Sequence, residues 1–208
     1  MTRFRFLMAR TLRQEAPLVR LSTPQASLLA TLQGKSVALI GNARSLAGRT
    51  EGAAIDGADL VIRINRAPMP SALSHGSRTD WLALATSIGA DDLDRIRPAR
   101  LLWMSHKRKR LDWRIATSPG FYLHPLPDYQ RLRDRLKAPP TTGLMMIDLL
   151  AASDLARLDL YGFDFFTSLS LTGSRTADQV PHDFAAERAF AEALAARDGR
   201  IMLPSSHG

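Results

Sequence analysis

The chain has 208 residues, of which 45% are hydrophobic and 23% are charged, and these proportions are ordinary for a globular protein. The length fits one domain with short additions better than two full domains. The absence of cysteine excludes a disulfide framework, a thiolate zinc site and a cysteine nucleophile. Lysine and arginine number 28 against 20 aspartates and glutamates, and the resulting charge of +8 favours an anionic partner: a nucleotide, a phosphorylated glycan, nucleic acid or an acidic membrane surface.

Residues 1–33 are predicted to form a basic N-terminal leader before the main domain, residues 34–208. Leu7, Leu12 and Leu18 are interleaved there with arginines. This pattern predicts an amphipathic helix packed on the domain, with a peripheral contact to an anionic membrane as the alternative. No apolar run has the length of a membrane-spanning helix, and the start lacks a signal-peptide cleavage site. We therefore expect a cytoplasmic protein, with peripheral attachment at the inner membrane face as a further option.

From residue 35 onward, short apolar runs alternate with helical patterns. Strands are predicted at 37–40, 60–65, 81–85, 101–104, 121–123, 158–163 and 200–203, and helices at 86–98, 143–155 and 184–196. This alternation predicts an α/β fold: a single Rossmann-like domain with a mostly parallel sheet and helices on both faces. The basic run 106–110 and the Ser/Thr-rich segment 165–181 are predicted to be loops, and the second has the length of a lid or an acceptor-binding segment.

Polar residues follow the first two predicted strands, where open parallel sheets bind ligands. Gly41 and Asn42 end the first strand, and Asn65 ends the second. Glycine lets a phosphate approach the backbone, and an asparagine can donate to a phosphate oxygen or a ribose hydroxyl. For Asn65 the structural alternative is a turn before a proline bend. The glycine fingerprint of dinucleotide-binding proteins is incomplete, and Asp56 and Asp59 come too early to bind a dinucleotide ribose, which argues against an oxidoreductase.

Two predicted helices begin with residues that could carry chemistry. Thr141, Thr142 and Gly143 open one helix, where hydroxyls, amides and the helix dipole can hold an anion; an ordinary threonine N-cap is the alternative. His182 begins the last long helix and Glu187 follows one and a half turns later. The pair could act as a general base with a supporting carboxylate, whereas a lone histidine is more often a cap or a surface residue.

Taken in order, these segments resemble the sialyltransferases of glycosyltransferase family 29. Residues 37–68 look like the large sialylmotif, residues 140–163 like the small one and residues 182–187 like the very small one. The resemblance implies an inverting, metal-independent transfer of a sialic acid, or of a related ulosonic acid such as Kdo, from a CMP-activated donor to a glycan hydroxyl. It implies no cofactor and no metal beyond the CMP-sugar substrate. It implies as partners the CMP-sugar donor and a glycan or glycolipid acceptor, and no nucleic acid.

The resemblance also implies individual roles. Asn42, which follows Gly41, and Asn65 match the motif asparagines that hold the nucleotide and phosphate of the donor. Thr141–Gly143 match the segment that cradles the donor. His182 matches the histidine that acts as general base on the acceptor hydroxyl, and Glu187 matches its accompanying carboxylate.

The chain also departs from the animal members of that family. It lacks their cysteine pair, which fits a bacterial-type homologue, and it lacks their further histidine between the small and very small motifs. Candidates to replace that histidine are Thr167, Ser170, Thr172, Arg175, His106 and His124. The alternatives to an active transferase are a weak or inactive nucleotide-binding homologue and an unrelated Rossmann oxidoreductase. Nucleic-acid binding would rest on charge alone, because no basic motif with interleaved aromatic residues is present.

Overall fold

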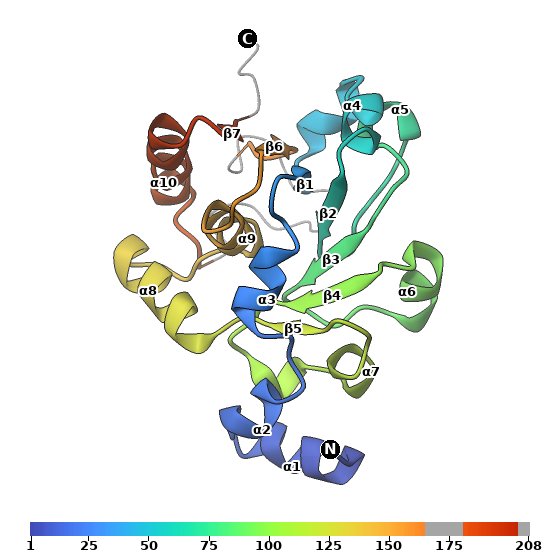
Figure 1. The fold of residues 1–208 in the computed structure, drawn as a ribbon, viewed down its shortest axis with the longest axis vertical. Coiled ribbons are helices and arrows are strands. Elements are labelled where there is room, and N and C mark those ends of the chain that lie inside the picture. Colours follow the sequence, from blue (N-terminus) through green and yellow to red (C-terminus); the bar gives the residue numbers. More distant parts are fainter. Residues whose placement is uncertain (165–180, 204–208) are drawn as a thin grey trace.

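The protein is built on one seven-stranded sheet, and the computed structural model describes residues 1–164 and 181–203 (Figure 1). The strands are β1 (Ser36–Ile40), β2 (Leu60–Ile64), β3 (Trp81–Leu84), β4 (Arg100–Trp103), β5 (Tyr122–Leu123), β6 (Arg157–Tyr161) and β7 (Ile201–Met202). They lie in the order β5-β4-β3-β2-β1-β6-β7, and every neighbouring pair is parallel. The predicted parallel α/β fold is confirmed, and each predicted strand is present with its ends shifted by two residues or fewer.

Helices connect the strands and cover the sheet. The α-helices are α1 (Arg3–Thr11), α2 (Glu15–Val19), α3 (Gln25–Ala30), α4 (Gly52–Asp56), α5 (Ala72–His75), α6 (Ala90–Ile96), α7 (Trp113–Ala116), α8 (Leu126–Leu136), α9 (Thr142–Ala151) and α10 (Phe184–Arg197). The described residues also form two short 3₁₀ helices, η1 (Arg44–Gly48) and η2 (Arg108–Arg110).

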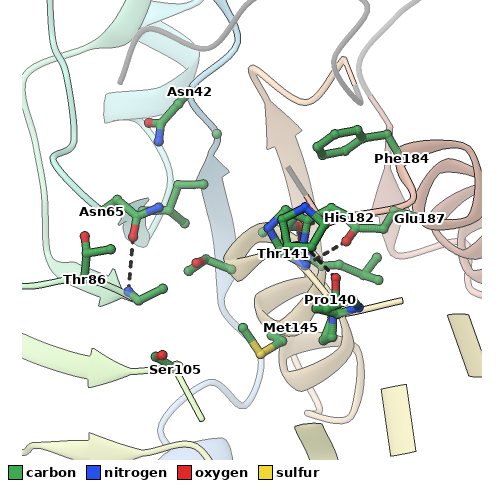
Figure 2. Close-up of a pocket in the computed structure, with 18 of the residues that line it drawn as sticks. Asn42, Asn65, Thr86, Ser105, Pro140, Thr141, Met145, His182, Phe184 and Glu187 are labelled. Carbon is green, nitrogen blue, oxygen red and sulfur yellow. Dashed lines mark hydrogen bonds between the residues drawn. The ribbon is translucent and has the colours of Figure 1, made fainter. Parts of the chain in front are cut away.

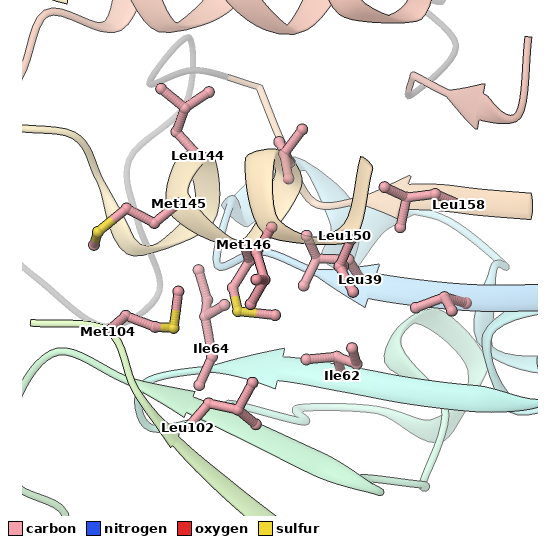
Figure 3. Packing of buried hydrophobic residues seen from close by; sticks show 14 of the residues in the cluster. Leu39, Ile62, Ile64, Leu102, Met104, Leu144, Met145, Met146, Leu150 and Leu158 are labelled. Carbon is pink, nitrogen blue, oxygen red and sulfur yellow. The ribbon is translucent and has the colours of Figure 1, made fainter. Parts of the chain in front are cut away.

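Alternate residues of each strand enter cores on opposite faces of the sheet, as the two-residue period of a strand requires. Leu39 and Ile62 belong to the larger core, to which α3, α8, α9 and α10 contribute. Helix α9 lies over β1 and β2 in Figure 3, and eight of its ten residues are buried. The opposite face carries Leu82 and Trp103, which pack with residues of α1, α2, α6 and α7, and next to them a smaller cluster formed with η1 and α4. Helices on both faces were predicted and are confirmed.

The chain changes direction at the centre of the sheet. From β1 it adds β2 to β5 on one side, and it then crosses over to place β6 and β7 on the other side. The segments that leave β1 and β6 meet at their carboxyl ends, where the Gly41 amide donates to the Tyr161 carbonyl at 2.7 Å. A Cβ on Gly41 would lie 2.3 Å from the Gly162 carbonyl oxygen, so only glycine permits this approach. Such a switch point is where open α/β sheets bind their ligands.

Two sequence expectations need correction. The N-terminal segment forms the three helices α1–α3 instead of one, and α1 buries Phe6 and Ala9 while Leu7 and Leu12 stay exposed. The basic run after β4 is not all loop: its central residue, Arg108, lies in η2 and is buried. Neither pattern could be placed from sequence because the partners that bury these residues are far away in the chain. No described helix has the length and apolar character needed to cross a membrane.

Candidate active site

A pocket of about 650 Å³ opens at the carboxyl ends of the central strands, where the chain changes direction (Figure 2). The eight site residues predicted from sequence all contribute to its wall: Gly41, Asn42, Asn65, Thr141, Thr142, Gly143, His182 and Glu187. They come from segments up to 146 positions apart in the sequence, from Gly41 to Glu187. The two asparagines lie on one side in Figure 2, and His182, Thr141 and Glu187 lie on the other.

Asn65 shapes the first side of the pocket. Its φ of +54° is left-handed, a conformation that asparagine tolerates better than most residues. Its backbone amide donates to the Ala83 carbonyl at 2.8 Å, and its Oδ1 accepts from the Ala85 amide at 3.1 Å. The side chain therefore ties the end of β2 to the end of β3. Its Nδ2 has no hydrogen-bond acceptor among the described residues and can serve a ligand.

Glu187 and Thr141 join helix α10 to the start of α9. One carboxylate oxygen of Glu187 accepts from the Thr141 amide at 2.7 Å, and the other accepts from the Thr141 hydroxyl at 2.6 Å. The same hydroxyl accepts from the Leu144 amide at 3.1 Å and so caps α9. Thr141 is thus both an N-cap and the partner of Glu187, which leaves Thr142 and Gly143 as the residues of this helix start available to a ligand.

The buried position of Glu187 shifts the pKa of its carboxyl group. Only 2% of the residue is exposed. Burial raises the pKa of Glu187 from 4.5 to about 7, against the opposing effect of its two hydrogen bonds from Thr141. The carboxyl therefore changes charge near neutral pH, directly behind the first turn of α9.

His182 lies just before α10, outside the helix, because Asp183 is the N-cap of that helix. Helical spacing from Glu187 therefore does not apply, and Glu187 contacts Thr141 where a supporting contact to the imidazole was expected. The His182 ring instead makes a 2.7 Å hydrogen bond through Nδ1 to the Pro139 carbonyl oxygen. A carbonyl only accepts, so Nδ1 carries the proton and the neutral ring keeps its lone pair on Nε2.

The pocket also has a basic side, of which the sequence predicted only His106, as a candidate to replace the missing histidine. It consists of His106, Lys107 and Arg110 from the segment after β4, together with Tyr129 and Arg133 from α8. The rings of His106 and Tyr129 stack with centroids 4.3 Å apart. Partial burial and the neighbouring cations lower the pKa of His106. Residues after β4 could have been found from their place at a strand's carboxyl end, whereas nothing in the sequence brings α8 to this pocket.

The two histidines considered as replacements for the missing one are now distinguished by position. His106 lines the pocket, whereas His124 is 1% exposed and is not among the lining residues. Burial lowers the pKa of His124 to about 4. The remaining candidates (Thr167, Ser170, Thr172 and Arg175) and most of the predicted loop 165–181 lie outside the described residues. No three potential His, Asp or Glu ligands gather into a metal site within residues 1–164 and 181–203.

Sequence comparison places the chain in a family. The family model of glycosyltransferase family 29 (sialyltransferase) matches residues 7–118, which is more than half of the chain and includes the large-motif segment. The protein therefore belongs to glycosyltransferase family 29, and it is a glycosyltransferase. The small-motif and very-small-motif segments lie beyond the matched residues. No curated protein matches the chain at the sequence level.

Solved sialyltransferases share the fold. A mammalian sialyltransferase in complex with Gal-beta-1-3GalNAc-ortho-nitrophenol superposes with a TM-score of 0.64 at 16% identity, over 98% of this chain and 85% of that chain. CstII from Campylobacter jejuni in complex with cytidine-5'-monophosphate gives 0.56 at 15% identity, over 82% and 80%. The same bacterial enzyme with a trisaccharide acceptor and CMP gives 0.53 at 15% identity, over 81% and 80%. At these identities the comparison supports the fold alone.

Proposed function

We propose that the protein transfers a sialic acid, or a related ulosonic acid such as Kdo, from a CMP-activated donor to a hydroxyl group of a glycan. His182 is the general base of this reaction. The donor lies between the ends of β1 and β2 and the start of α9, where Gly41, Asn42 and Asn65 contact the nucleotide and its phosphate.

The observation that carries the proposal is the hydrogen bond between His182 Nδ1 and the Pro139 carbonyl. It fixes the neutral ring in the tautomer whose Nε2 can accept a proton, and His182 lies in the wall of the pocket. A general base needs this available lone pair within reach of the acceptor hydroxyl. The two other candidate histidines are less suited to this role. His106 stacks on Tyr129 among cations, and His124 is buried.

The opposite requirement, stabilisation of an anionic leaving group, also has support in the pocket. The first turn of α9 directs its amide groups toward the pocket, and a helix N-terminus favours negative charge. Lys107, Arg110 and Arg133 add positive charge to the wall of the same pocket. The structural neighbours in complex with CMP and with a trisaccharide acceptor fit the same division into donor and acceptor.

The proposed reaction is a single displacement. The acceptor oxygen bonds to the anomeric carbon of the donor sugar while the bond from that carbon to the phosphate oxygen breaks. The acceptor proton goes to His182 Nε2, and the bonding electron pair leaves with CMP. Attack opposite the leaving group inverts the anomeric configuration. In this proposal the α9 amides and the basic side of the pocket offset the charge on CMP, so no metal and no cofactor takes part.

The test is a transfer assay with CMP-sialic acid and, separately, CMP-Kdo, offered with a panel of galactoside acceptors in the presence of EDTA. Released CMP and glycosylated product are both measured. We expect product from one of the donors, and His182→Ala should lower turnover by about 10²- to 10⁴-fold. CMP affinity and the unfolding midpoint should be unchanged in this variant.

Two results would contradict parts of the proposal. Loss of CMP binding together with turnover in His182→Ala would show that His182 holds the donor and is not the base. CMP binding with no transfer from either donor to any acceptor would instead favour a nucleotide-binding homologue without activity.

A further inference from the structure

The exposed apolar residues of the protein gather at its N-terminus. Among the described residues, the large hydrophobic side chains that remain exposed are Met1, Phe4, Leu7, Met8, Leu12, Val19 and Leu73. All except Leu73 lie in α1, in α2 or beside them. Phe4 is 72% exposed and Leu12 is 57% exposed, which is unusual for residues of this type. Figure 1 shows α1 and α2 together at one end of the molecule, far from α5.

These residues occupy one defined side of α1. Phe6 and Ala9 are buried, and the Phe6 ring packs edge-on against Trp113 with centroids 5.2 Å apart. The helical period of 3.6 residues then places Phe4, Leu7 and Met8 on the opposite side. We call these three residues the outer face of α1. Because the inner side is packed on the domain, the outer face has a fixed orientation toward the surroundings.

Positive charge surrounds the outer face. Arg3 and Arg5, which precede and follow Phe4 in α1, are exposed. Glu15 is the only acidic residue in residues 1–34, and its carboxylate pairs with Arg108 at 2.5 Å. Apolar side chains bordered by arginines match the acyl boundary and the phosphate layer of an anionic bilayer, where the arginine side chains can extend to the headgroups.

We propose that the outer face of α1 docks on an anionic lipid surface. Helix α1 contacts η2, and Arg10 of α1 donates to the Leu111 carbonyl, just after η2, at 2.8 Å. Arg110 of η2 lines the pocket. Helix α1 therefore packs against η2, the element that also contributes Arg110 to the basic side of the pocket. This arrangement suits an acceptor glycan carried on a lipid, an extension that rests on the proposed function.

The test measures co-sedimentation of the full chain with vesicles of phosphatidylcholine alone and with vesicles that also contain phosphatidylglycerol. The vesicles carry no glycan and no donor is added, so the result does not depend on transferase activity. We expect binding to the anionic vesicles. The double variant Phe4→Ser and Met8→Ser should lower this affinity by about tenfold or more. The matched control Leu73→Ser, which also removes an exposed apolar side chain, should bind like the parent.

A second pair of variants tests the charge. Arg3→Gln with Arg5→Gln should lower affinity for anionic vesicles by about tenfold or more, since each arginine near such a surface contributes about fivefold. The control Arg197→Gln, at the far end of α10, should have no effect. All variants replace exposed side chains, so their unfolding midpoints should match the parent.

The proposal is overturned if the chain does not bind anionic vesicles, or if the α1 variants bind as well as their controls. It is also overturned if ultracentrifugation shows a dimer that Phe4→Ser with Met8→Ser dissociates, because the outer face would then cover a second copy. Transfer to a soluble acceptor without vesicle binding would reject the docking surface and leave the proposed function intact.

Discussion

Replacing Glu187 with glutamine tests the buried contact behind the first turn of α9. Glutamine keeps the shape of the side chain: its oxygen can accept from the Thr141 amide, and its NH₂ group can donate to the Thr141 hydroxyl. What it removes is the ability to ionise. The side chain is 2% exposed, and burial raises the pKa of the carboxyl to about 7. Glu187 therefore makes the stability of the fold depend on pH, and the glutamine variant should lose that dependence.

The size and sign follow from the pKa. A rise from 4.5 to about 7, at about 1.4 kcal/mol for each pH unit, corresponds to about 3 kcal/mol. Because the folded state binds the proton more tightly, this stability is fully present below pH 4.5 and is lost as the pH rises toward 7. The free energy of unfolding of Glu187→Gln should therefore rise by about 3 kcal/mol relative to that of the parent as the pH increases from about 4.5 to about 8.

The assay is urea unfolding of parent and variant at pH values from about 4.5 to about 8. Only the difference between the two proteins is interpreted, because other groups titrate equally in both. Glu192→Gln is the matched control: it lies on the same helix but is exposed, and its difference from the parent should stay flat. A flat difference for Glu187→Gln as well would refute the account of a desolvated carboxyl at this position.

Other variants test the remaining parts of the pocket. Gly41→Ala should lower the free energy of unfolding by about 3 kcal/mol, because the added Cβ would meet backbone atoms that cannot shift. Gly143→Ala should lower it by less, because the Cβ added there would meet a phenylalanine ring that can shift. Urea titration measures both changes. Asn65→Ala should lower the free energy of unfolding by about 1–3 kcal/mol, because alanine is strained at this φ and the hydrogen bond to the Ala85 amide is lost. Asn65→Gly should be more stable than Asn65→Ala, because glycine adopts this φ without strain. It should still weaken CMP binding, which titration calorimetry measures. His106→Ala should weaken CMP binding about fivefold without changing its salt dependence, because the lowered pKa keeps this ring neutral near pH 7. The exposed Gln130→Ala is the unaffected control. Equal stability of the two glycine variants, or unchanged CMP affinity in Asn65→Gly or His106→Ala, would contradict these assignments.

The sheet could be predicted from sequence because its signal is local. Runs such as residues 37–40 and 60–62 are apolar throughout, which is typical of strands buried on both faces. Short helices such as α4 and α5 carry no such signal, since tertiary contacts decide where they form. The same limit applies to α1, because the choice of Phe6 over Leu7 as the buried residue depends on Trp113.

The site was predictable where its residues end a strand or begin a helix. Asn42, Asn65 and Thr141 meet in one pocket because parallel strands bring their carboxyl ends to one edge. The partner of Glu187 was not predictable, since its contact with Thr141 joins residues 46 positions apart. Arg133 was missed for the same reason: only the packing of α8 brings it to the pocket.

The central claim is that the pocket binds the CMP part of an activated sugar. Titration calorimetry of the purified chain with CMP, beside CDP, UDP and NAD and with EDTA present, tests it most directly. The account predicts selective binding of CMP that EDTA does not change and that Asn65→Gly weakens. Binding of NAD in place of CMP, or no binding of CMP at all, would contradict it.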